Sequence, residues 1–87
     1  MDNSELSDVA WDLVDHCRDA LTADELSTAF VRLGVGDHGE AMVLALRPIV
    51  RERRLPLPDQ LRARLIRVQQ VYYLDRELVE LMMRATA

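Results

Sequence analysis

Apolar residues recur at steps of three and four along almost the whole of this 87-residue chain. That spacing places them on one face of an α-helix, whereas a half-buried strand would alternate apolar and polar residues, and no segment sustains such alternation. The chain has only three glycines and three prolines, so few positions interrupt a helix. The sequence therefore predicts an all-α fold, a small bundle of about four helices in one domain that spans residues 1–87.

Start and stop signals divide the chain into four segments. Thr22 and Glu25 have the spacing of a capping box at the start of the second segment, and Asp37 and Glu40 repeat that spacing at the third. Gly34 is expected to end the second helix in a left-handed conformation. The predicted helices cover about residues 4–21, 23–33, 38–54 and 59–86.

The third helix is expected to be the central one. Residues 41–46 are six apolar residues in succession, so this stretch has no polar side. Pro48 lies inside the helical pattern, where it removes a backbone donor and crowds the preceding turn. We therefore expect a kink at Pro48 or an end of the helix near Leu46.

The last segment, residues 59–86, is longer than three shorter helices can cover. As one uninterrupted helix it would measure about 40 Å, and its apolar positions shift sideways near Val71, which indicates two packing partners for its two halves, with the helix long or bent. The apolar stripe of its second half belongs either to the core or to an interface with a partner or a second copy of the chain, and a homodimer is one expectation. The residues of this stripe are Val71, Leu74, Leu78, Leu81 and Met82.

Charge is divided along the chain, although the net charge is only −4. Residues 1–46 hold ten Asp or Glu and two Arg, a net of −8, whereas residues 47–67 hold seven Arg and two acids, a net of +5. Five carboxylates of the first helix fall in one stripe at steps of three and four: Glu5, Asp8, Asp12, Asp15 and Asp19. Because like charges at these spacings repel, the stripe is either solvated, paired with the chain's own arginines, or a docking surface for a basic partner. The predicted partner-binding residues are Asp8, Asp12, Asp15 and Asp19.

A second charged face is basic and consists of arginines. Arg47, Arg51 and Arg54 lie at i, i+4 and i+7 on one face of the third helix. This face is expected to pair with acidic helices of the same chain or of a partner, and it is a second predicted partner-binding surface. Binding of nucleic acid by residues 47–67 is the alternative, although the negative net charge is opposite to a nucleic-acid footprint.

The sequence offers no set of residues typical of a catalytic or metal site. Cys17 lies on an apolar stripe and is expected to be a small buried hydrophobe. The neighbouring His16 points about 100° away on a helix and cannot serve as its base. His16 and His38 lack the spacing of zinc ligands. Residues 21–34 resemble the entering helix of an EF-hand, but the residues after them lack the ligands of a calcium loop. We therefore expect no catalytic residue, no metal and no other cofactor.

The remaining signals concern location and class of function. The start of the chain is acidic where a secretory signal is basic, and no apolar run approaches the ~18–20 residues of a membrane span. These features favour a cytoplasmic protein that does not contact membranes. The sequence predicts a non-enzymatic protein-interaction module, an adaptor, small regulator or inhibitor- or immunity-type binder, whose partner is another protein or a second copy rather than a small-molecule substrate.

Overall fold

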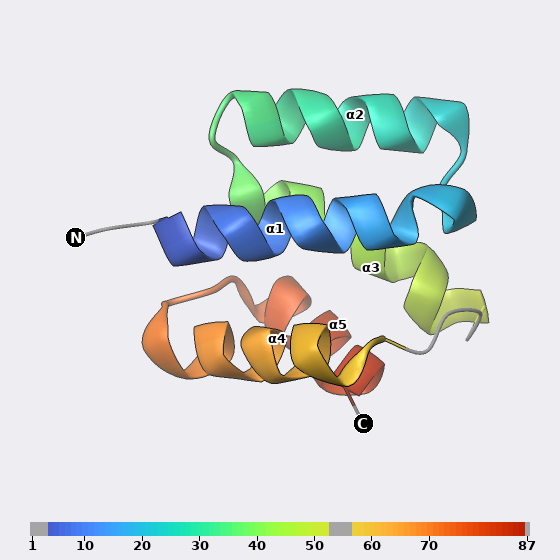
Figure 1. Cartoon of the computed structure of the whole chain (residues 1–87). Coiled ribbons are helices and arrows are strands. Elements are labelled where there is room, and N and C mark those ends of the chain that lie inside the picture. Colours follow the sequence, from blue (N-terminus) through green and yellow to red (C-terminus); the bar gives the residue numbers. More distant parts are fainter. Residues whose placement is uncertain (1–3, 53–56, 87) are drawn as a thin grey trace.

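The computed structural model describes residues 4–52 and 57–86, and every regular element in these residues is helical. In chain order the elements are α1 (Ser4–Cys17), a 3₁₀ helix (Arg18–Ala20), α2 (Ala23–Gly34), α3 (His38–Glu52), α4 (Asp59–Val71) and α5 (Arg76–Thr86), as Figure 1 shows. The prediction of an all-α fold is confirmed. The predicted number of four helices is too low by one, because residues 59–86 form two helices.

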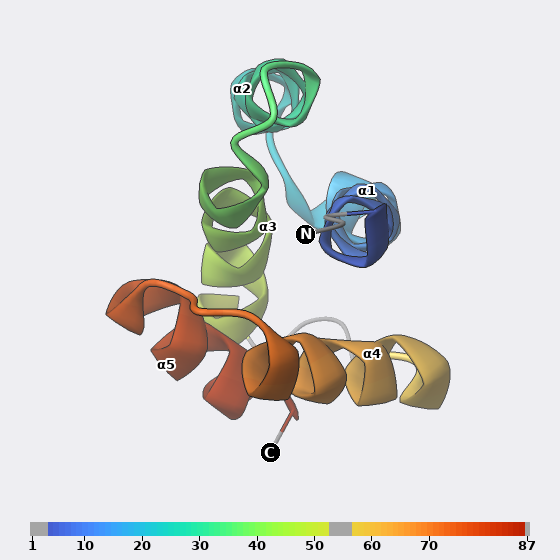
Figure 2. The same cartoon turned by 90° about the vertical axis from the view of Figure 1, so that its left-hand side faces the viewer.

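Helix α3 is the central element. In Figure 2 it stands between α2 at one end and the α4 and α5 pair at the other, with α1 packed along its side. Residues on several sides of α3 are buried, namely Ala41, Met42, Val43, Ala45, Leu46, Pro48 and Ile49. The apolar run in the sequence therefore identified the central helix correctly.

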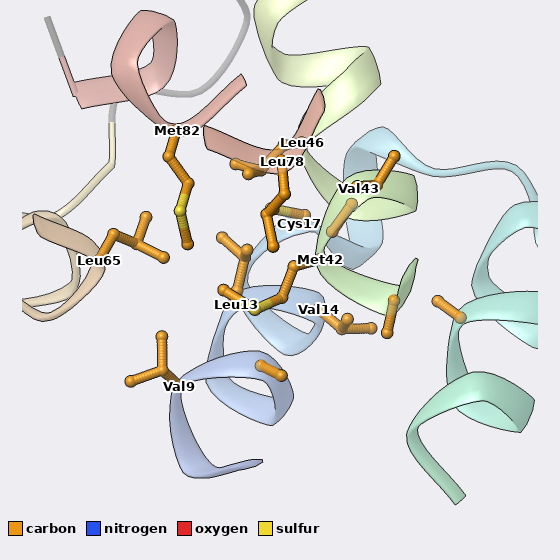
Figure 3. Packing of buried hydrophobic residues seen from close by; sticks show 14 of the residues in the cluster. Val9, Leu13, Val14, Cys17, Met42, Val43, Leu46, Leu65, Leu78 and Met82 are labelled. Carbon is orange, nitrogen blue, oxygen red and sulfur yellow. The ribbon is translucent and has the colours of Figure 1, made fainter. Parts of the chain in front are cut away.

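All five helices contribute to one apolar core. Burial of one large side chain in such a core stabilises the fold by about 1.5–3 kcal/mol. Helix α2 contributes only Ala29 and Leu33 to the buried set, so it lies at the periphery. Among the largest fully buried side chains of the other helices are Leu13, Met42, Leu46, Leu65, Leu78 and Met82, seen in Figure 3.

The connections on either side of α2 follow local sequence signals. The hydroxyl of Thr22 accepts from the backbone N–H of Glu25 at 3.1 Å, and the Glu25 carboxylate accepts from the backbone N–H of Thr22 at 2.8 Å, so the predicted capping box is confirmed. The glycine with the left-handed backbone is Gly36, with φ of 84°, and not Gly34, which is still helical. The prediction for Gly34 is therefore wrong by two residues. At the start of α3, Asp37 accepts from the backbone N–H of Glu40 at 3.4 Å.

Helix α3 continues through Pro48 as far as Glu52, so it does not end near Leu46 as one of the two expectations had it. Proline lacks the backbone donor that would bond four residues back, which removes one helical hydrogen bond. The Pro48 ring is buried, however, so its apolar packing offsets part of that loss. Residues 53 and 54, the predicted end of this helix, lie outside the described residues.

The single helix predicted for residues 59–86 is broken after Val71. Tyr72 has an extended backbone, with φ of −111° and ψ of 148°, and α5 begins at Arg76. Valine and tyrosine are weaker helix formers than alanine or leucine, so this stretch resists interruption less than its neighbours. The break lets α5 fold back against α3, which brings Leu78 and Met82 into the core.

Candidate interaction surface

One edge of α1 is joined to α4 by ion pairs. Arg64 donates to Asp12 and Arg67 donates to Glu5, each with a nitrogen-to-oxygen distance of 2.6 Å. All four side chains are partly exposed, so each pair contributes at most about 1 kcal/mol. We call Glu5 and Asp12 the α4 edge of α1. Here the acidic stripe meets the chain's own arginines, and Asp12, a predicted partner-binding residue, has a partner within the chain.

The other acidic residues of α1 and the following 3₁₀ helix remain at the surface. Asp15 pairs with Arg18 one turn further along, at 3.1 Å, and both side chains are more than half exposed. Asp8 and Asp19 are exposed and form no ion pair with any residue in the described ranges. These three predicted partner-binding residues therefore form no ion pair with α2, α3, α4 or α5 in the described residues.

Trp11 lies between Asp8 and Asp15, about one helical turn from each. Its side chain is 43% exposed, and its ring packs on Phe30 of α2 with ring centroids 5.9 Å apart and an interplanar angle of 34°. The indole N–H has no hydrogen-bond partner within residues 4–52 and 57–86. An indole in this position can receive a cation over its face and donate to an acceptor from a partner. We call Asp8, Trp11 and Asp15 the Trp11 edge of α1.

The contact between Trp11 and Phe30 is the feature that sequence reasoning missed. The apolar stripe of α1 passes through Leu13 and Cys17, and Trp11 lies off that stripe. Phe30 packs against the core but is only partly buried. The sequence did contain a signal for this contact, since Trp11 is a large aromatic residue on an otherwise acidic face of the helix. Exposing such a residue to water does not stabilise the fold, so its presence there indicates a contact.

The arginine face of α3 is only partly present in the described residues. Arg47 donates to Glu77 of α5 at 2.6 Å, and this hydrogen bond raises the pKa of Arg47. Arg51 is exposed and forms no ion pair with a described residue. Arg54, the third predicted member, lies outside the described residues. This face therefore supplies one contact that fastens α5 to α3 and one exposed guanidinium.

The predicted self-association stripe is divided between core and surface. Leu78 and Met82 are 1% and 0% exposed and point into the core in Figure 3. Leu74 and Leu81 are half-buried against the same core, and only Val71 is largely exposed, at 52%. Of the two alternatives that the sequence left open, core packing applies to Leu78 and Met82, because the break after α4 turns this side of α5 towards α3. The five residues do not form one continuous surface.

Two residues near the end of α1 have potential for covalent or acid–base chemistry, Cys17 and His16. Cys17 is fully buried, and burial raises the pKa of its thiol to about 12, so the thiol is protonated at neutral pH. The Nε2 atom of His16 is buried without a hydrogen-bond partner. The described part of the chain contains no group of three His, Cys, Asp or Glu residues placed to hold a metal ion.

None of the helices within residues 4–52 and 57–86 combines the length and the apolar character needed to cross a bilayer.

Comparison of the chain with known protein families, with curated proteins and with solved structures finds no match in any of the three.

Proposed function

We propose that this chain is a protein-interaction module without catalytic activity of its own, namely an adaptor, small regulator or inhibitor that acts in the cytoplasm. We propose further that the Trp11 edge of α1 binds a basic partner protein. The observation that carries the proposal is the exposed indole of Trp11, which packs on Phe30 and stands between two exposed carboxylates.

The residue types at this edge fit an interface better than they fit a solvated face. Tryptophan is enriched where proteins meet and supplies much of the binding energy when a partner covers it. Asp8 and Asp15 repel Glu5 and Asp12 at helical spacing, which disfavours the helix by a few tenths of a kcal/mol per pair. A basic partner would relieve that repulsion and would approach faster through the attraction of opposite charges.

The proposal that the chain is not an enzyme is supported by the state of its most nucleophilic group. Nucleophilic attack by cysteine requires the thiolate, and the buried Cys17 thiol keeps its proton far above neutral pH.

The alternative functions have less support. Self-association through α5 has less support because Leu78 and Met82, two residues of the predicted interface, are buried in the core. Nucleic-acid binding by the arginine-rich segment would have to compete with the carboxylates that hold Arg47, Arg64 and Arg67. Neither alternative has a specific observation in its favour.

Site-specific photo-cross-linking in the cells that produce the protein tests the proposed function. A photoreactive phenylalanine analogue would replace Trp11, Val31 or the fully exposed Tyr73 in separate variants. We expect one defined protein to be captured from position 11 or 31, and the purified pair to form a complex of fixed stoichiometry. Capture from position 73 alone, or failure of positions 11 and 31 to yield a protein that binds the purified chain, would contradict the proposal.

A further inference from the structure

The seam between α1 and α2 carries exposed apolar side chains beside a line of carboxylates. The two helices run side by side in opposite directions in Figure 1, both are seen end-on in Figure 2, and the Trp11 and Phe30 rings touch across the seam. At 100° per residue, Phe30 shares one flank of α2 with four exposed residues that carry no charge. These residues are Ala23, Ser27, Val31 and Gly34. The surface is therefore apolar or small from Trp11 across Phe30 to Val31, which is 60% exposed.

The α1 side of the seam is acidic. Asp8 and Asp15 flank Trp11, and Asp19 continues the line of carboxylates into the 3₁₀ helix. The one arginine of residues 4–20 is Arg18, which already pairs with Asp15. By the same helical geometry, Glu25 and Arg32 lie about 140° and 160° from Phe30, whereas Asp24 lies about 20° from Val31 and adds a carboxylate beside that residue.

This arrangement selects among the classes of partner. A nucleic acid or an anionic membrane would bring phosphates against Asp8 and Asp15, and like charges brought together at an interface disfavour binding strongly. An extended peptide would need backbone hydrogen bonds that the side-chain surfaces of two helices do not offer, whereas a helix satisfies its own backbone. A lysine or arginine from such a helix would meet both a carboxylate and the face of the indole.

We propose that the α1–α2 seam binds an amphipathic basic helix of a partner protein, with the apolar side of that helix on Trp11, Phe30 and Val31 and its basic edge against Asp8 and Asp15. This inference rests on the proposed function and names the chemistry of the partner. The 14 residues of α1 span about 21 Å, so the docked helix has about 12–14 residues.

A synthetic peptide tests the inference directly, because Trp11 is the only tryptophan and its fluorescence reports on the seam. The probe is a 14-residue peptide of leucine and lysine with the leucines on one helical face. One control peptide has the same composition in scrambled order, and another has glutamate in place of lysine. We expect the amphipathic lysine peptide alone to shift the Trp11 emission to the blue and to bind at 1:1 stoichiometry by calorimetry.

Matched variants localise the binding. Asp8→Asn and Asp75→Asn each remove one exposed carboxylate that has no ion pair in the described residues, one at the seam and one in the turn before α5. We expect Asp8→Asn to weaken binding about two- to fivefold at low salt, as for a charge at the rim of an interface, and Asp75→Asn to leave it unchanged. Val31→Ser is expected to weaken binding as well, without loss of helix signal in circular dichroism.

Four results would overturn the inference: no binding, equal binding of the scrambled peptide, equal affinity of the Asp8→Asn and Asp75→Asn variants, or saturation without any change in Trp11 emission. These results leave the proposed function standing if cross-linking from position 11 or 31 still captures a partner that binds the purified chain. Loss of capture at both positions removes the proposed function itself.

Discussion

The two edges of α1 carry the same type of residue in different surroundings. On the α4 edge, Glu5 and Asp12 accept hydrogen bonds from arginines of another helix at 2.6 Å. On the Trp11 edge, Asp8 has no ion pair in the described residues, Asp15 pairs only with the exposed Arg18 one turn further along, and an exposed indole lies between the two carboxylates. Carboxylates at one regular spacing therefore divide into two that fasten the fold and two that remain available to a partner, and the division is made by which helix packs beside them.

The largest expected difference between the two sides of α1 is in packing. Leu65 of α4 is fully buried, whereas Val31 of α2 is 60% exposed. We expect Leu65→Ala to lower the free energy of unfolding by about 2–5 kcal/mol, and Val31→Ala to change it by no more than about 0.5 kcal/mol. Urea unfolding followed by circular dichroism measures both, and a loss of several kcal/mol in Val31→Ala would show that the flank of α2 is part of the core.

The buried face of α1 beneath both edges can be tested through Cys17. Above pH 9, the usual pKa of a thiol, the unfolded chain loses the Cys17 proton, while the folded chain keeps it up to a pKa of about 12. The unfolded state then binds fewer protons than the folded state, so the free energy of unfolding falls by about 1.4 kcal/mol per pH unit between pH 9 and 12 from this group alone. Cys17→Ala should lack this contribution, and unfolding curves with the same pH dependence for both proteins would contradict the burial of the thiol.

A smaller effect is expected from the ion pairs of the α4 edge. A double-mutant cycle with Asp12→Asn and Arg64→Gln should give a coupling of up to about 1 kcal/mol at low salt, and less at 1 M salt. The cycle is needed because Asp12→Asn also relieves repulsion from its acidic neighbours on α1. A coupling of zero at low salt would mean that Arg64 does not hold Asp12 in solution.

The smallest effect concerns the electric field around Trp11. Asp8 and Asp15 should attract caesium ions and repel iodide, so caesium should quench Trp11 fluorescence more effectively relative to iodide in the parent protein than in the Asp8→Asn, Asp15→Asn double variant. Measurements at constant ionic strength, with uncharged acrylamide as the reference quencher, separate charge from exposure. An unchanged ratio in the double variant would show that the two carboxylates do not shape the surface around the indole.

Local signals allowed the sequence to predict much of the fold. The Thr22 capping box involves residues three apart, so the sequence contains all the information it needs. The sequence left open whether α3 continues through Pro48, and it predicted one long or bent helix where the chain breaks after Val71, because each outcome depends on what the rest of the chain packs against those residues. Burial of the proline ring and the return of α5 onto α3 are tertiary effects that override local preference.

The candidate surface was predictable only as a pattern of charge. The spacing of the acidic residues placed Asp8, Asp12 and Asp15 on one side of a helix, but the path of α4 decides which of them meets an arginine. The contact between Trp11 and Phe30 depends on how α2 packs beside α1. The spacing of residues within either helix does not predict that packing.

The most direct test of the division between the two edges compares Asp8→Asn with Asp12→Asn in the same two assays, urea unfolding and binding of the amphipathic lysine peptide. Asp12→Asn should lose the Arg64 contact and leave the protein less stable than Asp8→Asn does, while peptide affinity stays nearly unchanged. Asp8→Asn should keep or slightly raise stability, because it removes repulsion on α1, and it should weaken binding about two- to fivefold. The opposite assignment, with binding sensitive to Asp12 and stability sensitive to Asp8, would contradict the division.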